Sequence, residues 1–178
     1  MIIPQFKTVS PPVILNPFSI ECLGAILDNC GSDLSVAFSA TWGTANMVLY
    51  IPFTITTPDT VKQMFVMNGT SPSGVTHVGI YTEDFTRMVM ASATQAGGTA
   101  IQTFDITDTF LAVGTYYMAL GSTSSTFPVF RVNVSHPAIR IAGIYQQLTA
   151  VPLPAIGTPA IMAQAFIPVF GLVFGDTI

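Results

Sequence analysis

The composition of this 178-residue chain excludes two broad classes of protein. Half of its residues are hydrophobic, whereas disordered chains combine low hydrophobicity with high charge, so we expect the chain to fold. The formal net charge is -4 and the five basic residues are scattered, so we expect no nucleic-acid binding. Only 8% of the residues are charged, against about a quarter in ordinary soluble domains, which favours a protein that assembles with other subunits.

The first segment, residues 1–43, is predicted to be an extended N-terminal arm with a short connecting stretch. Four prolines among its first seventeen residues prevent a regular helix, while the apolar residues around them favour burial. The stretch from Cys22 to Gly31 favours a short helix that ends at the glycine. The spacing of Cys22 and Cys30 matches neither a CxxC redox motif nor a zinc knuckle, so free thiols, a local disulfide and a metal site all remain open.

Residues 44–135 contain one predicted strand after another and form the expected β-sandwich domain. In MVLYIPFTI, every second residue from Met47 to Ile55 is large and apolar, which predicts one strand face against a core. Pro52 lacks an amide hydrogen and therefore predicts a sheet edge or a bulge. Seven strand-like segments are separated by turns, and no segment has a helical stripe over three turns. We expect an all-β chain, an antiparallel β-sandwich or jelly roll with extended N- and C-terminal arms.

Alternation within the strands also predicts which side chains face the core. In LAVGTYYMALGS, Tyr116 and Met118 lie on one face of a strand, and Tyr117 and Ala119 lie on the other. One tyrosine ring should therefore pack inside the sandwich, while the other meets solvent, a ligand or a neighbouring subunit. The predicted core face contains Leu49, Ile51, Phe53, Phe65, Val78, Ile80, Phe104 and Met118.

A resemblance is carried by the run VGIYTEDFTRMVMASATQAGG and the later stretch IQTFDITDTFLAVGTYYMALGS. This part resembles β-sandwich modules of virion proteins of tailed bacteriophages. Its LAVGTYY strand is also similar to the L-x-x-G-T-Y-Y strand of pre-peptidase C-terminal modules of secreted bacterial proteins. The likeness covers about residues 47–134, and it implies a structural or carbohydrate-contacting module.

The two histidines, His77 and His136, do not predict an active site. A Ser-His-Asp triad needs a nucleophile turn and oxyanion donors, and the sequence has no motif for either. The most economical interpretation of each histidine is an ordinary core or surface residue, so we expect no enzymatic activity and no cofactor.

The acidic residues are likewise interpreted as turn residues. Glu83 and Asp84 fall in a predicted hairpin turn, and Asp105 and Asp108 fall at a strand end. Glycoside hydrolysis needs two carboxylates facing each other across one cleft, and nothing in the sequence brings these pairs together. Calcium binding at Asp105 and Asp108 remains an open alternative. The usual D-x-D-x-D-G calcium loop is absent, so the preferred prediction is no metal site.

These observations leave two leading hypotheses for function. The first is a virion structural protein, a decoration, fibre-base or tail-associated subunit that binds copies of itself and other virion proteins. The second is a glycan-binding adhesion module for host attachment, in which an exposed Trp42, Tyr81 or Tyr117 stacks on a sugar.

The last segment, residues 136–178, is predicted to be an apolar, proline-rich tail used in subunit contacts. From Ile141 to Gly175 it has no charged residue, but prolines and Gln164 interrupt it, so a tail bound to a neighbouring subunit is favoured over a membrane span. The predicted assembly contacts are Ile161, Phe166, Val169, Phe170, Leu172 and Phe174.

Overall fold

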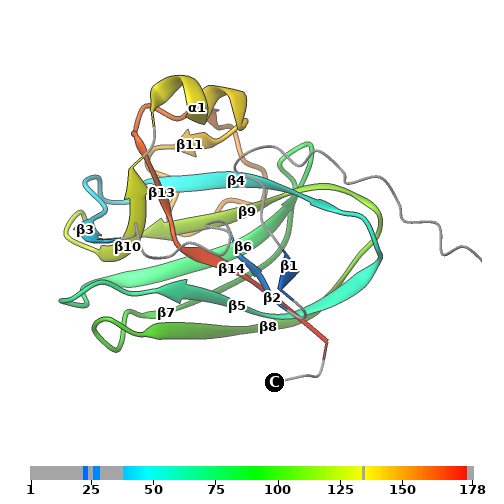
Figure 1. The fold of residues 1–178 in the computed structure, drawn as a ribbon, viewed down its shortest axis with the longest axis horizontal. Coiled ribbons are helices and arrows are strands. Elements are labelled where there is room, and N and C mark those ends of the chain that lie inside the picture. The colour runs from blue at the N-terminus through cyan, green and yellow to red at the C-terminus, as the bar shows by residue number, and fades with distance from the viewer. Residues whose placement is uncertain (1–21, 24–25, 29–37, 134, 176–178) are drawn as a thin grey trace, which may run out of the picture.

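The chain folds as an antiparallel β-sandwich, which confirms the predicted fold class (Figure 1). The computed structural model describes residues 22–23, 26–28, 38–133 and 135–175. Residues 1–21 of the predicted arm and Cys30 lie outside the described residues. In the described part, three antiparallel sheets account for nearly all of the regular structure, and the one helix has six residues.

The six-stranded sheet contains most of the strands predicted for residues 44–135. Pro52 predicted an edge strand or a bulge, but β4 lies between β11 and β9 and its register with β9 is regular; β11 pairs only with Val48–Tyr50, so Pro52 has a neighbouring strand on one side alone. Because no strand lies beside Pro52 on the β11 side, its missing amide hydrogen costs no hydrogen bond there. In order across the sheet the strands are β12 (Ala160–Ile161), β11 (Tyr145–Gln147), β4 (Val48–Ile55), β9 (Gly114–Ser122), β6 (Val75–Thr82) and β7 (Arg87–Thr94).

The other two sheets join segments that are far apart in the sequence. The last strand, β14, lies between β2 and β5, with Leu172 opposite Leu27 on one side and Met64 on the other. The five-stranded sheet has the order β1 (Cys22–Leu23), β2 (Ile26–Asp28), β14 (Phe170–Phe174), β5 (Asp59–Met67) and β8 (Ile101–Leu111). The three-stranded sheet has the order β13 (Phe166–Pro168), β10 (Pro128–Asn133) and β3 (Phe38–Thr41).

These pairings correct the predicted division of the chain at residues 44 and 135. Strand β3 precedes the first boundary and pairs with β10, while β14 follows the second boundary and pairs with β5. The expected helix from Cys22 was also wrong, because Cys22–Leu23 pairs with Ile26–Asp28 as a strand. Backbone pairing thus joins β3 and β14 to strands that are distant in sequence.

The principal core contains side chains from both large sheets, and it confirms the predicted core face. Seven of the eight predicted residues belong to it, while Phe65 is buried but lies outside it. Strand β5 has an irregularity between Val61 and Gln63, so its inward positions shift to Met64 and Val66. Simple alternation could not reveal this shift.

A second, smaller core covers the outer face of the six-stranded sheet. Residues 148–157 cross this face and place Ala150 and Leu153 against Val48, Tyr50 and nearby side chains of β6 and β9. Gly79 and Gly121 permit this close approach. A Cβ at Gly79 would lie 2.8 Å from a methyl carbon of Leu153, and a Cβ at Gly121 would lie 3.0 Å from a methyl carbon of Val151. This layer explains why β4 is buried on both of its faces.

The single helix among the described residues, α1 (His136–Ile141), connects β10 to β11. Its first turn is capped by Ser135, whose Oγ accepts a hydrogen bond from the Ala138 amide at 3.4 Å. Pro137 at the start of the helix needs no amide partner there. Within the described ranges no helix has the length and apolar character required to span a membrane.

Candidate functional site

The predicted assembly contacts of the tail lie, with one exception, inside the protein itself. Phe166, Phe170, Leu172 and Phe174 belong to the principal core, and Val169 is buried beside them. The expectation that these five side chains bind a neighbouring subunit is therefore corrected. The backbone of β14 pairs with β2 on one side and β5 on the other, and its side chains are buried within its own chain.

Ile161 is the exception, with 54% of its surface exposed. It lies in β12 directly opposite Tyr145, at the edge of the six-stranded sheet. Paired residues of an antiparallel sheet share a face, so Ile161 lies on the same outer face as the ring of Tyr145. Of the predicted tail contacts, this residue alone remains available to another molecule.

Trp42, predicted as a sugar-stacking residue, is fully buried. Its indole Nε1 donates to the Met47 carbonyl oxygen at 3.1 Å. The rings of Phe127 and Phe166 meet it edge-on, with centroid distances of 5.5 and 5.8 Å. The prediction of an exposed tryptophan is corrected, because the ring anchors the junction of three distant segments in the core.

Tyr81 is also fully buried, so the second predicted stacking residue is corrected as well. Its hydroxyl donates to the Pro154 carbonyl oxygen at 2.7 Å, and its ring packs edge-on against Tyr50 at 5.1 Å. Burial raises the pKa of the Tyr81 hydroxyl and raises that of Tyr50 to about 12. Both phenols therefore stay neutral and structural at ordinary pH.

Tyr117 is the predicted aromatic that keeps part of its surface in solvent. Its ring stacks on Phe85 with a centroid distance of 4.4 Å and meets Tyr145 edge-on at 5.9 Å. Tyr116 points the opposite way and packs against the principal core. The expected division of the two tyrosines between the two faces is thus confirmed. A stacked neighbour already occupies one face of the Tyr117 ring.

The charge-free segment, residues 141–175, supplies exposed apolar side chains as well as core residues. Four of its aliphatic side chains have more than half of their surface in solvent. Figure 1 shows α1 and β11 beyond β4, at one edge of the six-stranded sheet, and Ile156 forms a bridge to Thr86 at the β6–β7 turn. The four side chains are Ile141 (74% exposed), Leu148 (56%), Ile156 (66%) and Ile161 (54%).

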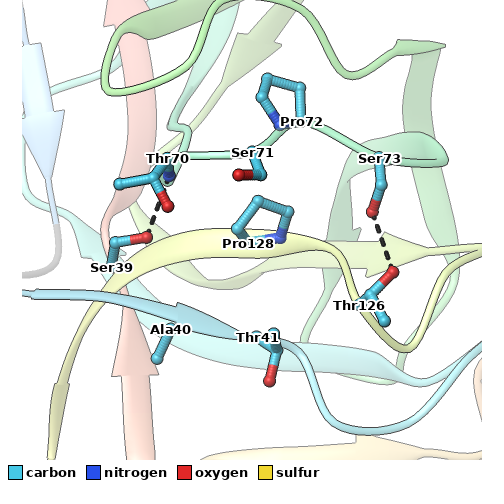
Figure 2. A pocket seen from close by; sticks show the side chains of 9 residues that line it. All are labelled: Ser39, Ala40, Thr41, Thr70, Ser71, Pro72, Ser73, Thr126 and Pro128. Carbon is cyan, nitrogen blue, oxygen red and sulfur yellow. Dashed lines mark hydrogen bonds between the residues drawn. The ribbon is translucent and has the colours of Figure 1, made fainter.

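A pocket of about 530 Å³ lies where β3, the β5–β6 turn and the start of β10 meet (Figure 2). Its lining has no charged side chain; six of the nine lining residues have a hydroxyl group, and the other three are an alanine and two prolines. Figure 2 shows Pro72 and Pro128 on opposite sides of Ser71. The lining residues are Ser39, Ala40, Thr41, Thr70, Ser71, Pro72, Ser73, Thr126 and Pro128.

Buried amide side chains hold the pocket walls in place. Gln95 donates to the Asn68 side-chain oxygen at 2.9 Å and to the Pro128 carbonyl oxygen at 2.6 Å, and it accepts from the Ser73 amide at 2.8 Å. Asn68 in turn donates to the Gln102 side chain at 2.8 Å. This network joins the β5–β6 turn, through Ser73, to the start of β10, through Pro128. Buried amides whose hydrogen bonds are satisfied in this way make a rigid support.

Close backbone contact forms another side of the pocket. The Gly69 amide donates to the Pro128 carbonyl oxygen at 2.9 Å, and a Cβ at this position would lie 2.7 Å from the Pro128 ring. The Thr70 amide donates to Ser39 Oγ at 3.0 Å, which joins the β5–β6 turn to β3. Glycine is required here because any side chain would separate the turn from β10.

The pocket was missed in the sequence, although a signal for it exists. Four of its six hydroxyls come from the stretches NGTSPSG, interpreted only as a turn, and GSTSSTFP, and the other two come from β3. Both turns, together with β3, lie at the same end of the sandwich. Serine and threonine clusters in two turns that the strand order brings together were the available indication.

The histidines do not form a catalytic arrangement in the described residues. His77 is buried, its Nδ1 has no hydrogen-bond partner there, and burial lowers its pKa. His136 is the first residue of α1.

Two of the acidic residues singled out in the sequence, Asp84 and Asp108, make polar contacts with other side chains. Asp84 accepts from the Thr82 hydroxyl in the β6–β7 turn, and Asp108 accepts from Lys62 at 2.5 Å. No group of three or more His, Cys, Asp or Glu residues that could hold a metal is found in the described part of the chain.

Comparisons of the chain with protein-family models, curated proteins and solved structures give no match.

Proposed function

We propose that the chain is a non-enzymatic structural protein of a virion, serving as a decoration, fibre-base or tail-associated subunit. Its partners in this proposal are further copies of itself and other virion proteins. It contributes a rigid β-sandwich and binds neighbours through exposed residues of the charge-free segment.

The observation that carries the proposal is the exposure of Ile141, Leu148, Ile156 and Ile161 within a segment that has no charged residue. Single exposed aliphatic residues are common on monomers, but charged neighbours normally separate them. Here 35 consecutive residues, 141–175, supply no charge. Contact with another subunit would remove this apolar surface from water, which favours association by about 25 cal/mol per Å² buried.

Two further features support a structural role. The exposed side chains lie on a sandwich whose two cores are well packed, so they are presented by a firm scaffold. The sequence from about residue 47 to 134 also resembles β-sandwich modules of tailed-phage virion proteins, and this resemblance is the reason for proposing a virion rather than another assembly.

The mass of the purified chain in solution tests the assembly part. We expect sedimentation equilibrium to give an oligomer, and Ile161→Asp combined with Ile141→Asp to shift the mass toward that of one chain. Phe110→Asp is the matched control, because Phe110 is 63% exposed but lies in β8, outside the charge-free segment. A native chain that remains monomeric at high concentration, or a double variant that associates normally, would contradict the proposal.

The virion part needs a separate measurement, because self-association alone does not identify the assembly. Particles purified from the producing cells should contain the chain in stoichiometric amounts, and antibody-labelled micrographs should locate it at repeated positions. Its absence from such particles would refute virion localisation even if the chain forms oligomers.

A further inference from the structure

We propose that the hydroxyl-lined pocket binds a neutral saccharide of one or two sugar rings. This inference goes beyond the structural role, because no residue of the charge-free segment lines the pocket and binding there does not need assembly. Its volume of about 530 Å³ falls within the range of small-molecule sites, about 300–1,000 Å³. The nature of its lining indicates which chemistry would be recognised.

The absence of charge in the lining argues against ions as ligands. A bound phosphate or sulfate would need a cation or several N–H donors directed at it, and the lining has no basic side chain. The nearby guanidinium of Arg131 does not line the pocket. It donates to the Thr41 carbonyl oxygen at 2.9 Å and lies over the Phe166 ring at 4.2 Å.

At one side of the pocket, the lining hydroxyls of Ser73 and Thr126 form a closed triangle with Ser124 Oγ, which is not part of the lining. Ser73 Oγ lies 3.2 Å from Ser124 Oγ and 3.2 Å from Thr126 Oγ1, which are 2.9 Å from each other (the Ser73–Thr126 pair is drawn in Figure 2). Each hydroxyl has one proton, so three mutual hydrogen bonds use all three protons. Ser124 Oγ also accepts from the Thr126 amide at 3.2 Å, so the lone pairs that remain for the hydroxyls of a ligand are those of Ser73 and Thr126.

The opposite side of the pocket offers donors. Ser39 Oγ accepts from the Thr70 amide, so its own proton is available to a ligand. The hydroxyls of Thr70 and Ser71 also line the pocket, and a hydroxyl can both donate and accept. A sugar hydroxyl is both donor and acceptor, so a saccharide suits a lining with acceptors at one side and donors at the other.

The prolines supply the apolar part of the site. Pro72 and Pro128 flank Ser71, and their rings offer rigid C–H surfaces against which a sugar ring can pack (Figure 2). The Asn68–Gln95–Gln102 amide network already fixes both walls. Binding therefore orders few side chains, which reduces its entropic cost.

The test begins with an array of neutral and acidic glycans probed with the native chain, followed by calorimetry with the neutral saccharide bound best. We expect neutral glycans to bind in preference to sialylated or sulfated ones. Thr126→Val removes one hydroxyl at nearly constant volume and should weaken binding about fivefold. Ser71→Trp fills the pocket from an exposed turn position and should abolish binding.

Thr107→Val is the matched control, because Thr107 is an exposed threonine of β8 outside the pocket, and it should bind like the native chain. Thermal unfolding of each variant confirms that it is folded, and Ser71→Ala replaces Thr126→Val if the latter is not. Absence of binding to every neutral glycan, a preference for acidic glycans, or undiminished binding by Ser71→Trp would overturn the proposal. Each of these results is independent of the oligomeric state.

Discussion

Replacing Leu172 with alanine should destabilise the fold strongly, because β14 is part of the core and not a free tail. Leu172 is fully buried between β2 and β5. The substitution removes one methine and two methyl carbons, equivalent to three methylene groups that each contribute about 0.8 kcal/mol of burial. The cavity that remains increases the total loss to about 3–4 kcal/mol. A domain with a typical stability of about 5–15 kcal/mol would survive this loss, so the variant can be measured.

Urea unfolding followed by tryptophan fluorescence is the appropriate assay. The chain has a single tryptophan, Trp42, which is buried and contacts Phe166 of β13, so its emission reports on the packing of the last strands. Ile161→Ala is the control from the same apolar segment, and its exposed side chain should contribute less than about 0.5 kcal/mol. A loss below about 1 kcal/mol for Leu172→Ala, or equal losses for the two variants, would refute the assignment of β14 to the core.

Three further predictions concern the outer face and the β6–β7 turn. Burial raises the pKa of Tyr50 from 10.0 to about 12, so the stability that its neutral hydroxyl contributes is full below pH 10 and is lost as the pH rises to about 12. Tyr50→Phe should therefore make the free energy of unfolding fall less steeply with pH over this range. An unchanged pH dependence would count against this prediction. Gly79→Ala places a Cβ 2.8 Å from a methyl carbon of Leu153 and 2.8 Å from a backbone oxygen of β7. It should therefore lower the free energy of unfolding by about 1–3 kcal/mol, measured by thermal unfolding. A variant as stable as the native chain would show that residues 148–157 can move aside at little cost. The hydrogen bond from Thr82 lowers the pKa of Asp84, so Thr82→Val should raise that pKa in an NMR titration, and no rise would exclude the bond as the main cause.

The residues between 44 and 135 show how far alternation predicts this fold. In β4, β6 and β9 the side chains alternate with a period of two, and the predicted inward residues are in the core. Alternation reports a local property, the face on which a side chain lies. It failed locally in β5, where the irregularity after Val61 exchanges the two faces and leaves Phe65 outside the principal core.

The partner of each strand was not predictable in the same way. The apolar character of Phe170–Phe174 shows only that this strand must be buried, and β2, β5 or another subunit would each satisfy that need. The pocket has a similar origin, since Ser39, Ser73 and Thr126 come from three separate segments. Trp42 and Tyr81 were expected on the surface because nothing local indicates that distant segments cover them.

The position of β14 also determines when the sheet can be completed during synthesis. Phe170 pairs with Val66, so the ribosome must add about a hundred residues after β5 before its partner emerges. At about 5–20 residues per second, this interval lasts on the order of 5–20 s. Throughout it, the β5 edge that β14 later occupies lacks its final neighbour, and such edges recruit strands of other chains. Polysomes carrying this message are therefore where premature association and chaperone demand should be greatest, and slower translation of the codons for residues 136–175 should lower the yield of native protein.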